Sequence, residues 1–209
     1  RWSLFNGLRV LGINVSENTY TPDDTVARCH RAGMQWDHVI VRDNHPGLGE
    51  VMTWVASLGM LSPETAGPSE IVFSAHAKGV KYGGTKMPSV IKRWSELMYE
   101  VNLDNIDRIH RSLNWFSATG AFRTRYRKTD GCRHGWFYSG AFWWWRLRDI
   151  AQHNWDYVSP WYAGRETWIG DKLERHESDC LFMDASRSPY DEKYWKSVHW
   201  PVTAPSGWP

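Results

Sequence analysis

A histidine, a lysine and a glycine follow one of the most apolar stretches of this chain, and together they suit phosphate chemistry. Residues 70–75 predict a strand typical of a buried parallel position, and His76, Lys78 and Gly79 come directly after it. Ligands of open α/β sheets bind at the carboxyl ends of the strands. Lysine is a compact cation and glycine lets backbone approach closely, so the segment is predicted to bind phosphate. The alternative is a solvated basic loop.

The most aromatic stretch, residues 136–146, is interrupted at its centre by Ser139 and Gly140. Aromatic residues favour strands, and a glycine inside a strand marks a bulge or the close approach of a ligand or another backbone. We therefore expect one strand in which Ser139 and Gly140 bring the backbone close to a bound ligand.

The rings around this interruption are candidate platforms for a sugar or a base, because Tyr and Trp combine a flat apolar face with a polar tip. The candidates are Tyr138 and Trp143. Strand alternation sends Trp143 and Trp145 to one face and Trp144 to the other. One of these faces is expected to be core and the other to line a pocket. The alternative is an aromatic core on both.

Two further segments place polar side chains beside predicted helix starts. Glu166, flanked by Arg165 and followed by Trp168, is a candidate general base. Its alternative role is that of an acidic residue favoured by the helix dipole. Asn44 and Glu50 lie between a strand and a helix, where phosphate or ribose contacts are common, although Asn, Pro and Gly there also fit simple turn chemistry.

The composition is that of a globular protein with an excess of tryptophan. The 209 residues suffice for one domain with a core, or for a domain and a tail. The 15 tryptophans indicate stacking surfaces, unless they reflect a compositional bias of the lineage. The net charge of +2 is too small to indicate a nucleic-acid partner by itself.

The three cysteines, Cys29, Cys132 and Cys180, are far apart and show neither metal-ligand spacing nor a disulfide framework. That pattern fits a reducing compartment. No apolar run approaches the roughly 18 residues of a membrane span, and no signal peptide is visible. We therefore expect a cytoplasmic protein. Walker, GxGxxG and GxSxG motifs are absent from the sequence.

Alternation of strands and helices predicts an α/β fold with a mostly parallel sheet. A Pro- and Trp-rich tail is expected over 186–209, with loops at 79–87 and 123–134. Residues 88–113 are expected to form one long helix or two abutting ones. The other predicted helices are 22–32, 48–61, 147–152 and 165–175, and the strands are 8–15, 37–41, 70–75, 116–122 and 136–146.

The order of these motifs resembles a group of bacterial and viral glycosyltransferase-like proteins. The resemblance covers most of residues 1–183, and each motif is weak alone. The matching segments are Trp2-Ser-Leu-Phe-Asn-Gly7, His76-Ala-Lys-Gly79, Trp94-Ser-Glu-Leu-Met98, Phe137-Tyr-Ser-Gly-Ala-Phe-Trp143 and Glu166-Thr-Trp168.

The resemblance implies a single Rossmann-like domain of the GT-A type over residues 1–185, with a mostly parallel mixed sheet flanked by helices. It also implies a further strand ahead of residue 1. In that architecture an Asp-X-Asp segment usually holds Mn²⁺ or Mg²⁺ on the donor diphosphate. Here His76-Ala-Lys78 takes its place, so we assign no metal ligand. A positioned cation would stabilise the leaving diphosphate instead.

The implied activity is transfer of a hexose from a nucleotide-diphosphate sugar to an acceptor hydroxyl, with Glu166 as the base. The expected contacts are His76, Lys78 and Gly79 to the diphosphate; Asn44 and Glu50 to the nucleotide; and Tyr138, Ser139, Gly140, Trp143, Arg165 and Trp168 to the sugar.

The acceptor expected by default is a glycan or a glycolipid. A hydroxylated base of viral DNA is the rival, because a basic segment with aromatic neighbours holds Arg123, Arg125, Arg127, Lys128 and Arg133. From other classes, a non-catalytic carbohydrate-binding module and a purely structural interaction domain are the alternatives.

Overall fold

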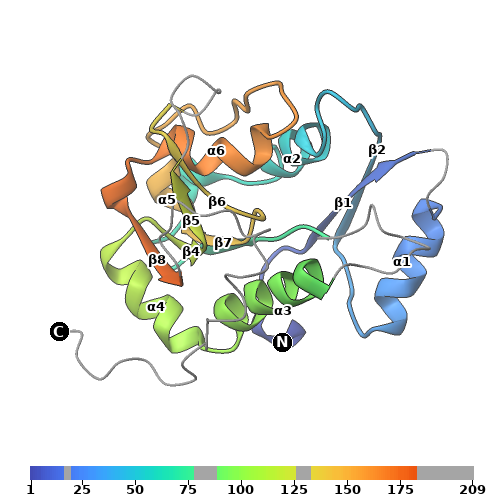
Figure 1. Cartoon of the computed structure of the whole chain (residues 1–209), viewed down its shortest axis with the longest axis horizontal. Helices are drawn as coiled ribbons and strands as arrows, with labels where there is room; N and C mark the ends of the chain where they lie inside the picture. Colours follow the sequence, from blue (N-terminus) through green and yellow to red (C-terminus); the bar gives the residue numbers. More distant parts are fainter. Residues whose placement is uncertain (17–19, 78–88, 126–132, 183–209) are drawn as a thin grey trace.

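The first part of the fold is a pair of parallel strands joined by a helix (Figure 1). The computed structural model describes residues 1–16, 20–77, 89–125 and 133–182. Strand β1 (Val10–Val15) pairs with β2 (His38–Asp43), and helix α1 (Pro22–Arg31) makes the crossover that parallel strands need. These three elements confirm the strand–helix–strand prediction for this region.

Helix α1 begins where its local sequence requires. Thr21 is the N-cap, and its hydroxyl accepts a hydrogen bond from the backbone N–H of Asp24. Pro22 occupies the first helical position, where its missing N–H costs no hydrogen bond.

A four-stranded sheet forms the centre of the molecule, in the order β3-β7-β4-β8. Strand β7 runs antiparallel to both β3 and β4, whereas β4 and β8 are parallel. The strands are β3 (Ile71–Ser74), β4 (Ala118–Ala121), β7 (Trp143–Arg146) and β8 (Ser178–Phe182). The expectations of a mostly parallel sheet and of a parallel position for β3 are therefore wrong for the described strands. The sequence analysis did not predict β8.

The aromatic stretch forms two strands instead of the single predicted one. Strand β6 (Trp136–Tyr138) pairs with β5 (Arg123–Arg125) in a separate two-stranded sheet, while β7 lies in the central sheet. The turn between them has positive φ at Gly140 (90°) and Ala141 (54°), which no strand adopts. It turns the chain so that β7 enters the sheet against the direction of β3.

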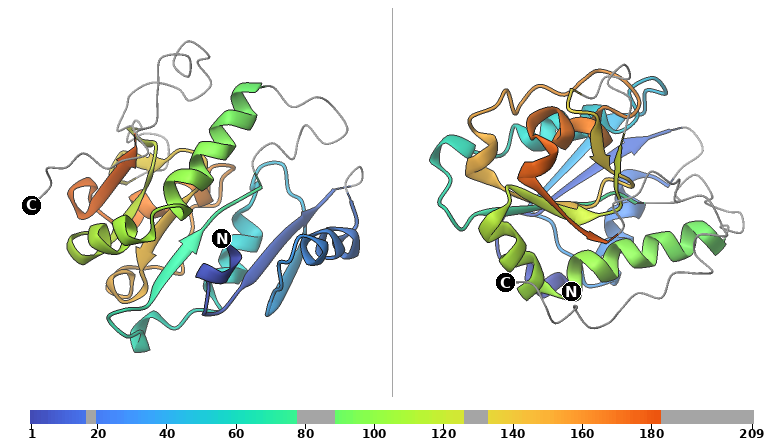
Figure 2. Two further views of the ribbon diagram at one scale, coloured as in Figure 1. Left: turned by 90° about the horizontal axis from the view of Figure 1, so that it is seen from below. Right: turned by 60° about the vertical axis from the view of Figure 1, so that its left-hand side comes forward.

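Helices cover both faces of the central sheet (Figures 1 and 2). Helices α3 and α4 lie on one side, and α2, α5 and α6 lie on the other. The predicted helix over 88–113 is two abutting helices, because Asn105 caps the second by accepting from the N–H of Arg108. The helices are α2 (Val51–Leu58), α3 (Ser89–Leu103), α4 (Ile106–Trp115), α5 (Leu147–Ile150) and α6 (Gly164–Lys172), with short 3₁₀ turns at Trp2–Leu4, Pro63–Thr65 and Arg175–Glu177.

Both faces of the sheet are core. Trp143 and Trp145 pack with α2, α5 and α6, whereas Trp144 packs with α3 and α4. The predicted alternation of these three rings is confirmed, and all three rings are buried. Loop 79–87 and tail 186–209 lie outside the described residues. No helix in the described ranges is long and apolar enough to cross a membrane.

Candidate functional site

The carboxyl ends of three strands meet at one edge of the central sheet. Strands β3, β4 and β8 point the same way, since β7 opposes β3 and β4 and β8 is parallel to β4. Ser74 and Gly120 both pair with Trp143, the first residue of β7. The turn 139–142 therefore lies at the same sheet edge as His76, which follows the carboxyl end of β3. This edge holds the candidate site.

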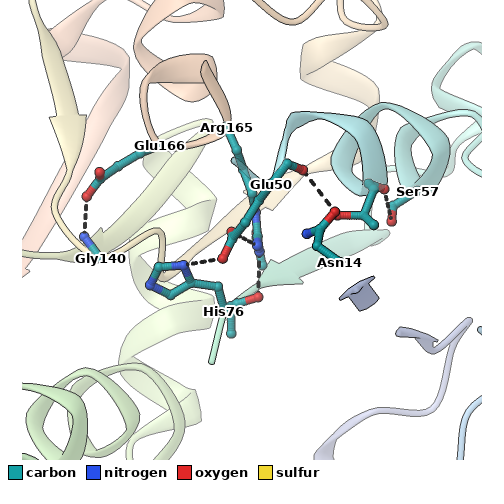
Figure 3. Close-up of polar contacts among 10 residues, drawn as sticks. Asn14, Glu50, Ser57, His76, Gly140, Arg165 and Glu166 are labelled. Carbon is teal, nitrogen blue, oxygen red and sulfur yellow. Dashed lines mark hydrogen bonds and ion pairs between the residues drawn. The ribbon is translucent and has the colours of Figure 1, made fainter. Parts of the chain in front are cut away.

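Three charged or titratable side chains from distant segments converge there (Figure 3). The Glu50 carboxylate pairs with the Arg165 guanidinium through Oε2 and with His76 Nδ1 through Oε1, at 2.8 Å for the histidine. Arg165 also donates to the backbone oxygen of Ala75 at 2.5 Å and to Ser74 Oγ at 3.3 Å. The arginine thereby ties the end of β3 to the first turn of α6.

Close packing of α2 and α6 brings Glu50 and Arg165 together. Glu50 is the N-cap of α2, and Arg165 is the second residue of α6. The first residue of α6, Gly164, is buried against α2: a Cβ there would lie 3.0 Å from Val51 Cγ2 and 2.0 Å from the Ser159 backbone oxygen. Only a glycine allows this approach.

Two consecutive hydrogen bonds, which were not predicted from the sequence, fix the start of α2 to β1. Asn14, near the end of β1, donates to Thr53 Oγ1 at 3.2 Å, and that hydroxyl donates to the Glu50 backbone oxygen at 3.1 Å. An asparagine inside the apolar run 10–15 was the available signal.

The charges around Glu50 keep it ionised. Burial alone would raise its pKa, but Arg165 and His76 outweigh that effect and lower the pKa from 4.5 to about 2. The guanidinium of Arg165 lies 5.2 Å from the ring centroid of Trp54, a cation–π distance. An anionic Glu50 between two nitrogen groups is the ground state of this site.

The ionised carboxylate also fixes the tautomer of His76. Because Glu50 can only accept, Nδ1 of His76 carries the proton of the hydrogen bond. Nε2 is buried and has no hydrogen-bond partner in the described ranges. The side chain of His76 is 18% exposed, so it lies just below the surface.

Glu166 lies at the same edge but has a separate partner. Its Oε1 accepts a hydrogen bond from the Gly140 N–H at 2.6 Å. This contact links the first turn of α6 to the turn between β6 and β7. Together with Phe122, Gly140 and Ala141 form a group of positive-φ residues at this edge, and such conformations are concentrated at functional sites.

The side of Gly140 where a side chain would stand faces the protein interior, and it is filled by core atoms instead of a sugar. A Cβ there would lie 2.3 Å from Met98 Sδ and 3.2 Å from the Trp94 ring. Ser139 is 5% exposed, and its hydroxyl is hydrogen-bonded to Thr124 Oγ1 at 2.8 Å.

The predicted ring platforms are core residues. Tyr138, Trp143 and Trp168 are each 0% exposed and belong to one hydrophobic cluster. A ring with no exposed face has nothing to stack on a sugar, so their prediction as sugar contacts is wrong for this structure. Asn44 is exposed just beyond β2, and Lys78 and Gly79 lie outside the described residues.

No group of three or more His, Cys, Asp or Glu side chains arranged to hold a metal ion occurs within the described ranges. The comparisons add no assignment: no family model, no curated protein and no solved structure matches this chain. The structure itself therefore establishes a mixed α/β fold with a polar site at one sheet edge.

Proposed function

We propose that this protein is a glycosyltransferase that moves a hexose from a nucleotide-diphosphate sugar to an acceptor hydroxyl. One observation carries the proposal: Arg165 and His76, 89 positions apart, meet at the carboxyl end of β3 beside a second carboxylate, Glu166. Cationic nitrogen groups and a nearby base are what such a transfer needs.

The proposed reaction is a displacement at the anomeric carbon of the donor sugar. The acceptor oxygen forms a bond to that carbon, and the bond from the carbon to the diphosphate oxygen breaks. The electron pair of the broken bond stays on the nucleoside diphosphate, whose growing charge faces Arg165 and His76. Glu166 takes the proton that the acceptor hydroxyl loses.

Glu50 acts as a positioning residue in this proposal. Its carboxylate holds Arg165 and His76 at the edge of β3, each through a different oxygen. Arg165 retains N–H groups beyond those used by Glu50, because a guanidinium has five donors, whereas Nε2 of His76 donates only when the imidazole carries a second proton. A diphosphate that binds here adds to these contacts and does not need to displace Glu50.

The GT-A type architecture and the glycosyltransferase-like family are part of the proposal. The support is the resemblance in motif order together with the mixed α/β fold and the location of the site at strand carboxyl ends. Comparing nucleotide-sugar binding with and without Mn²⁺ tests whether the protein depends on a divalent metal.

A glycan or a glycolipid is the better-supported acceptor. The DNA alternative depends on a basic segment, but Arg123 points inward: its guanidinium donates to the backbone oxygens of Arg175 and Ser178. It is therefore not free for a phosphate. Weak, salt-independent binding to duplex DNA is expected, and steeply salt-dependent binding would favour DNA instead.

The carbohydrate-binding module is less well supported, because its tryptophans would have to be exposed. Seven tryptophans of the described part are buried, and Trp115, at 83% exposure, is the one classed as exposed there. Within the described ranges, most of the tryptophans therefore serve the core.

The test is a thermal-shift panel of UDP-, GDP-, ADP-, CDP- and dTDP-hexoses, with and without Mn²⁺. A ligand that binds only the folded state raises Tm. We expect one nucleotide class to raise Tm and to be hydrolysed slowly without acceptor. A panel with no shift would overturn the proposal, and binding without hydrolysis would favour a non-catalytic module.

A further inference from the structure

An exposed tyrosine stands beside the site, in the loop that leads into α6. The side chain of Tyr162 is 71% exposed, whereas the aromatic residues first predicted as platforms are fully buried. Tyr162 precedes Arg165 by three residues. It was not among the residues that the sequence analysis selected.

The ring of Tyr162 packs against the segment that supplies Glu50. If Gly49 carried a Cβ, that atom would lie 3.3 Å from Cδ2 and 3.5 Å from Cε2 of Tyr162, and 2.9 Å from its backbone oxygen. Gly49 has φ of 53°, a conformation that favours glycine. Tyr162 thus lies against the residue directly before Glu50, and it precedes Arg165 by three residues in the chain.

We propose that Tyr162 is a stacking platform for a pyranose ring of the acceptor. This inference rests on the proposed function and names its acceptor class. The C–H face of a pyranose packs on an aromatic ring, while its hydroxyl rim needs polar partners at the edge of that ring. The ring of Tyr162 is largely exposed. It lies against Gly49, and the next residue, Glu50, belongs to the polar site.

The three other aromatic residues classed as exposed in the described part are less suitable. The ring of Tyr20 has the Arg28 guanidinium 3.6 Å from its centroid. Tyr157 is 52% exposed, but the Lys172 ammonium lies 5.4 Å from its ring centroid. Trp115 is the last residue of α4, on the opposite side of the central sheet from α6 (Figure 1). Trp115 is therefore a control: a large exposed ring that is remote from the site.

The expected positions of the donor and the acceptor follow from how deeply their proposed contact residues are buried. Arg165 and His76 are 13% and 18% exposed, so the diphosphate is expected below the rim. Tyr162 lies at the surface, where an incoming acceptor arrives. A nucleobase would also stack on a tyrosine, and the experiment separates the two ligands.

The experiment measures steady-state KM for donor and acceptor in the wild type, Tyr162→Ala, Tyr162→Phe and Trp115→Ala. The donor is the nucleotide sugar found by the thermal-shift panel, and the acceptors are cellobiose, maltose, lactose and methyl β-glucoside. We expect Tyr162→Ala to raise the acceptor KM ~2- to 10-fold, with a smaller change in the donor KM. Tyr162→Phe should retain most of the affinity, and Trp115→Ala should change neither KM.

Three outcomes would overturn the platform. The first is an unchanged acceptor KM in Tyr162→Ala. The second is a rise confined to the donor KM, which would assign the ring to the nucleobase. The third is a wild type that hydrolyses the donor but neither uses nor binds any of the four sugars by saturation-transfer NMR. Failure of every nucleotide sugar to bind would instead overturn the proposed function.

Discussion

Glu50 and Arg165 are 115 positions apart in the sequence, and their ion pair joins the N-terminal ends of α2 and α6. The same carboxylate holds His76 through its other oxygen. One anionic side chain therefore fixes both nitrogen groups that we propose to face the donor diphosphate. Five predictions test this site and the packing that supports it.

Replacing the carboxylate of Glu50 with an amide should destabilise the fold. In Glu50→Gln the largely buried Arg165 loses its ionic partner. Removing one member of a fully buried pair costs ~3–5 kcal/mol, and we expect about 1–2 kcal/mol here because Glu50 is partly solvated. The measurement is urea unfolding at pH 7, with Glu96→Gln on the surface of α3 as control. Equal stability of the two variants would contradict the pairing.

The same variant has a predicted pH dependence. The pKa of Glu50 is about 2 in the folded protein against an ordinary 4.5, so its charge stabilises the fold above pH 4.5. This contribution is lost as pH falls from about 5 towards 2. The difference in unfolding free energy between wild type and Glu50→Gln should therefore shrink over that range. A difference that stays constant would show that the charge of Glu50 is not involved.

Gly140→Ala should be far more costly than an alanine at an unhindered glycine. The new methyl group would lie 2.3 Å from Met98 Sδ, in addition to the strain of a positive φ. Gly33 has a similar φ of 79° with open space around it, so Gly33→Ala measures the backbone strain alone. We expect Gly140→Ala to cost about 1–3 kcal/mol more. Equal costs in chemical unfolding would mean that Met98 moves aside freely.

Two buried tryptophans should respond differently to phenylalanine. The indole N–H of Trp168 donates to the Trp155 backbone oxygen at 2.9 Å, whereas that of Trp143 has no partner in the described part of the chain. Trp168→Phe leaves the Trp155 carbonyl without its hydrogen-bond donor. Trp143→Phe only removes an N–H group that has no partner in the described part of the chain. We expect Trp168→Phe to be the less stable variant by ~1 kcal/mol in urea unfolding. The reverse order would contradict the assigned hydrogen bond.

Glu166→Gln should separate catalysis from binding. Loss of a general base lowers kcat ~10²- to 10⁴-fold. The amide keeps an oxygen for the Gly140 N–H, so the fold and the donor affinity should change little. Rapid-quench or steady-state assays give kcat, and titration gives the donor Kd. A loss of affinity with unchanged kcat would assign Glu166 to binding instead.

Local patterns in the sequence determined most of the individual elements. Thr21, Pro22 and the acidic residues after them define the start of α1, because capping and dipole effects act within one turn. The alternation of Trp143, Trp144 and Trp145 between two cores follows from the two-residue period of a strand. Such features depend on neighbours in sequence, so a single chain displays them.

Tertiary structure alone decided which elements pair and which charges meet. The antiparallel insertion of β7 between β3 and β4, and the burial of Tyr138, Trp143 and Trp168, depend on contacts between segments far apart in the chain. Sequence analysis selected Glu50, His76 and Arg165 separately, yet nothing local indicates that one carboxylate holds the other two. Their meeting requires α2 to pack on α6 at Gly164 and β3 to end beneath them, and side-chain periodicity carries no information about such long-range packing.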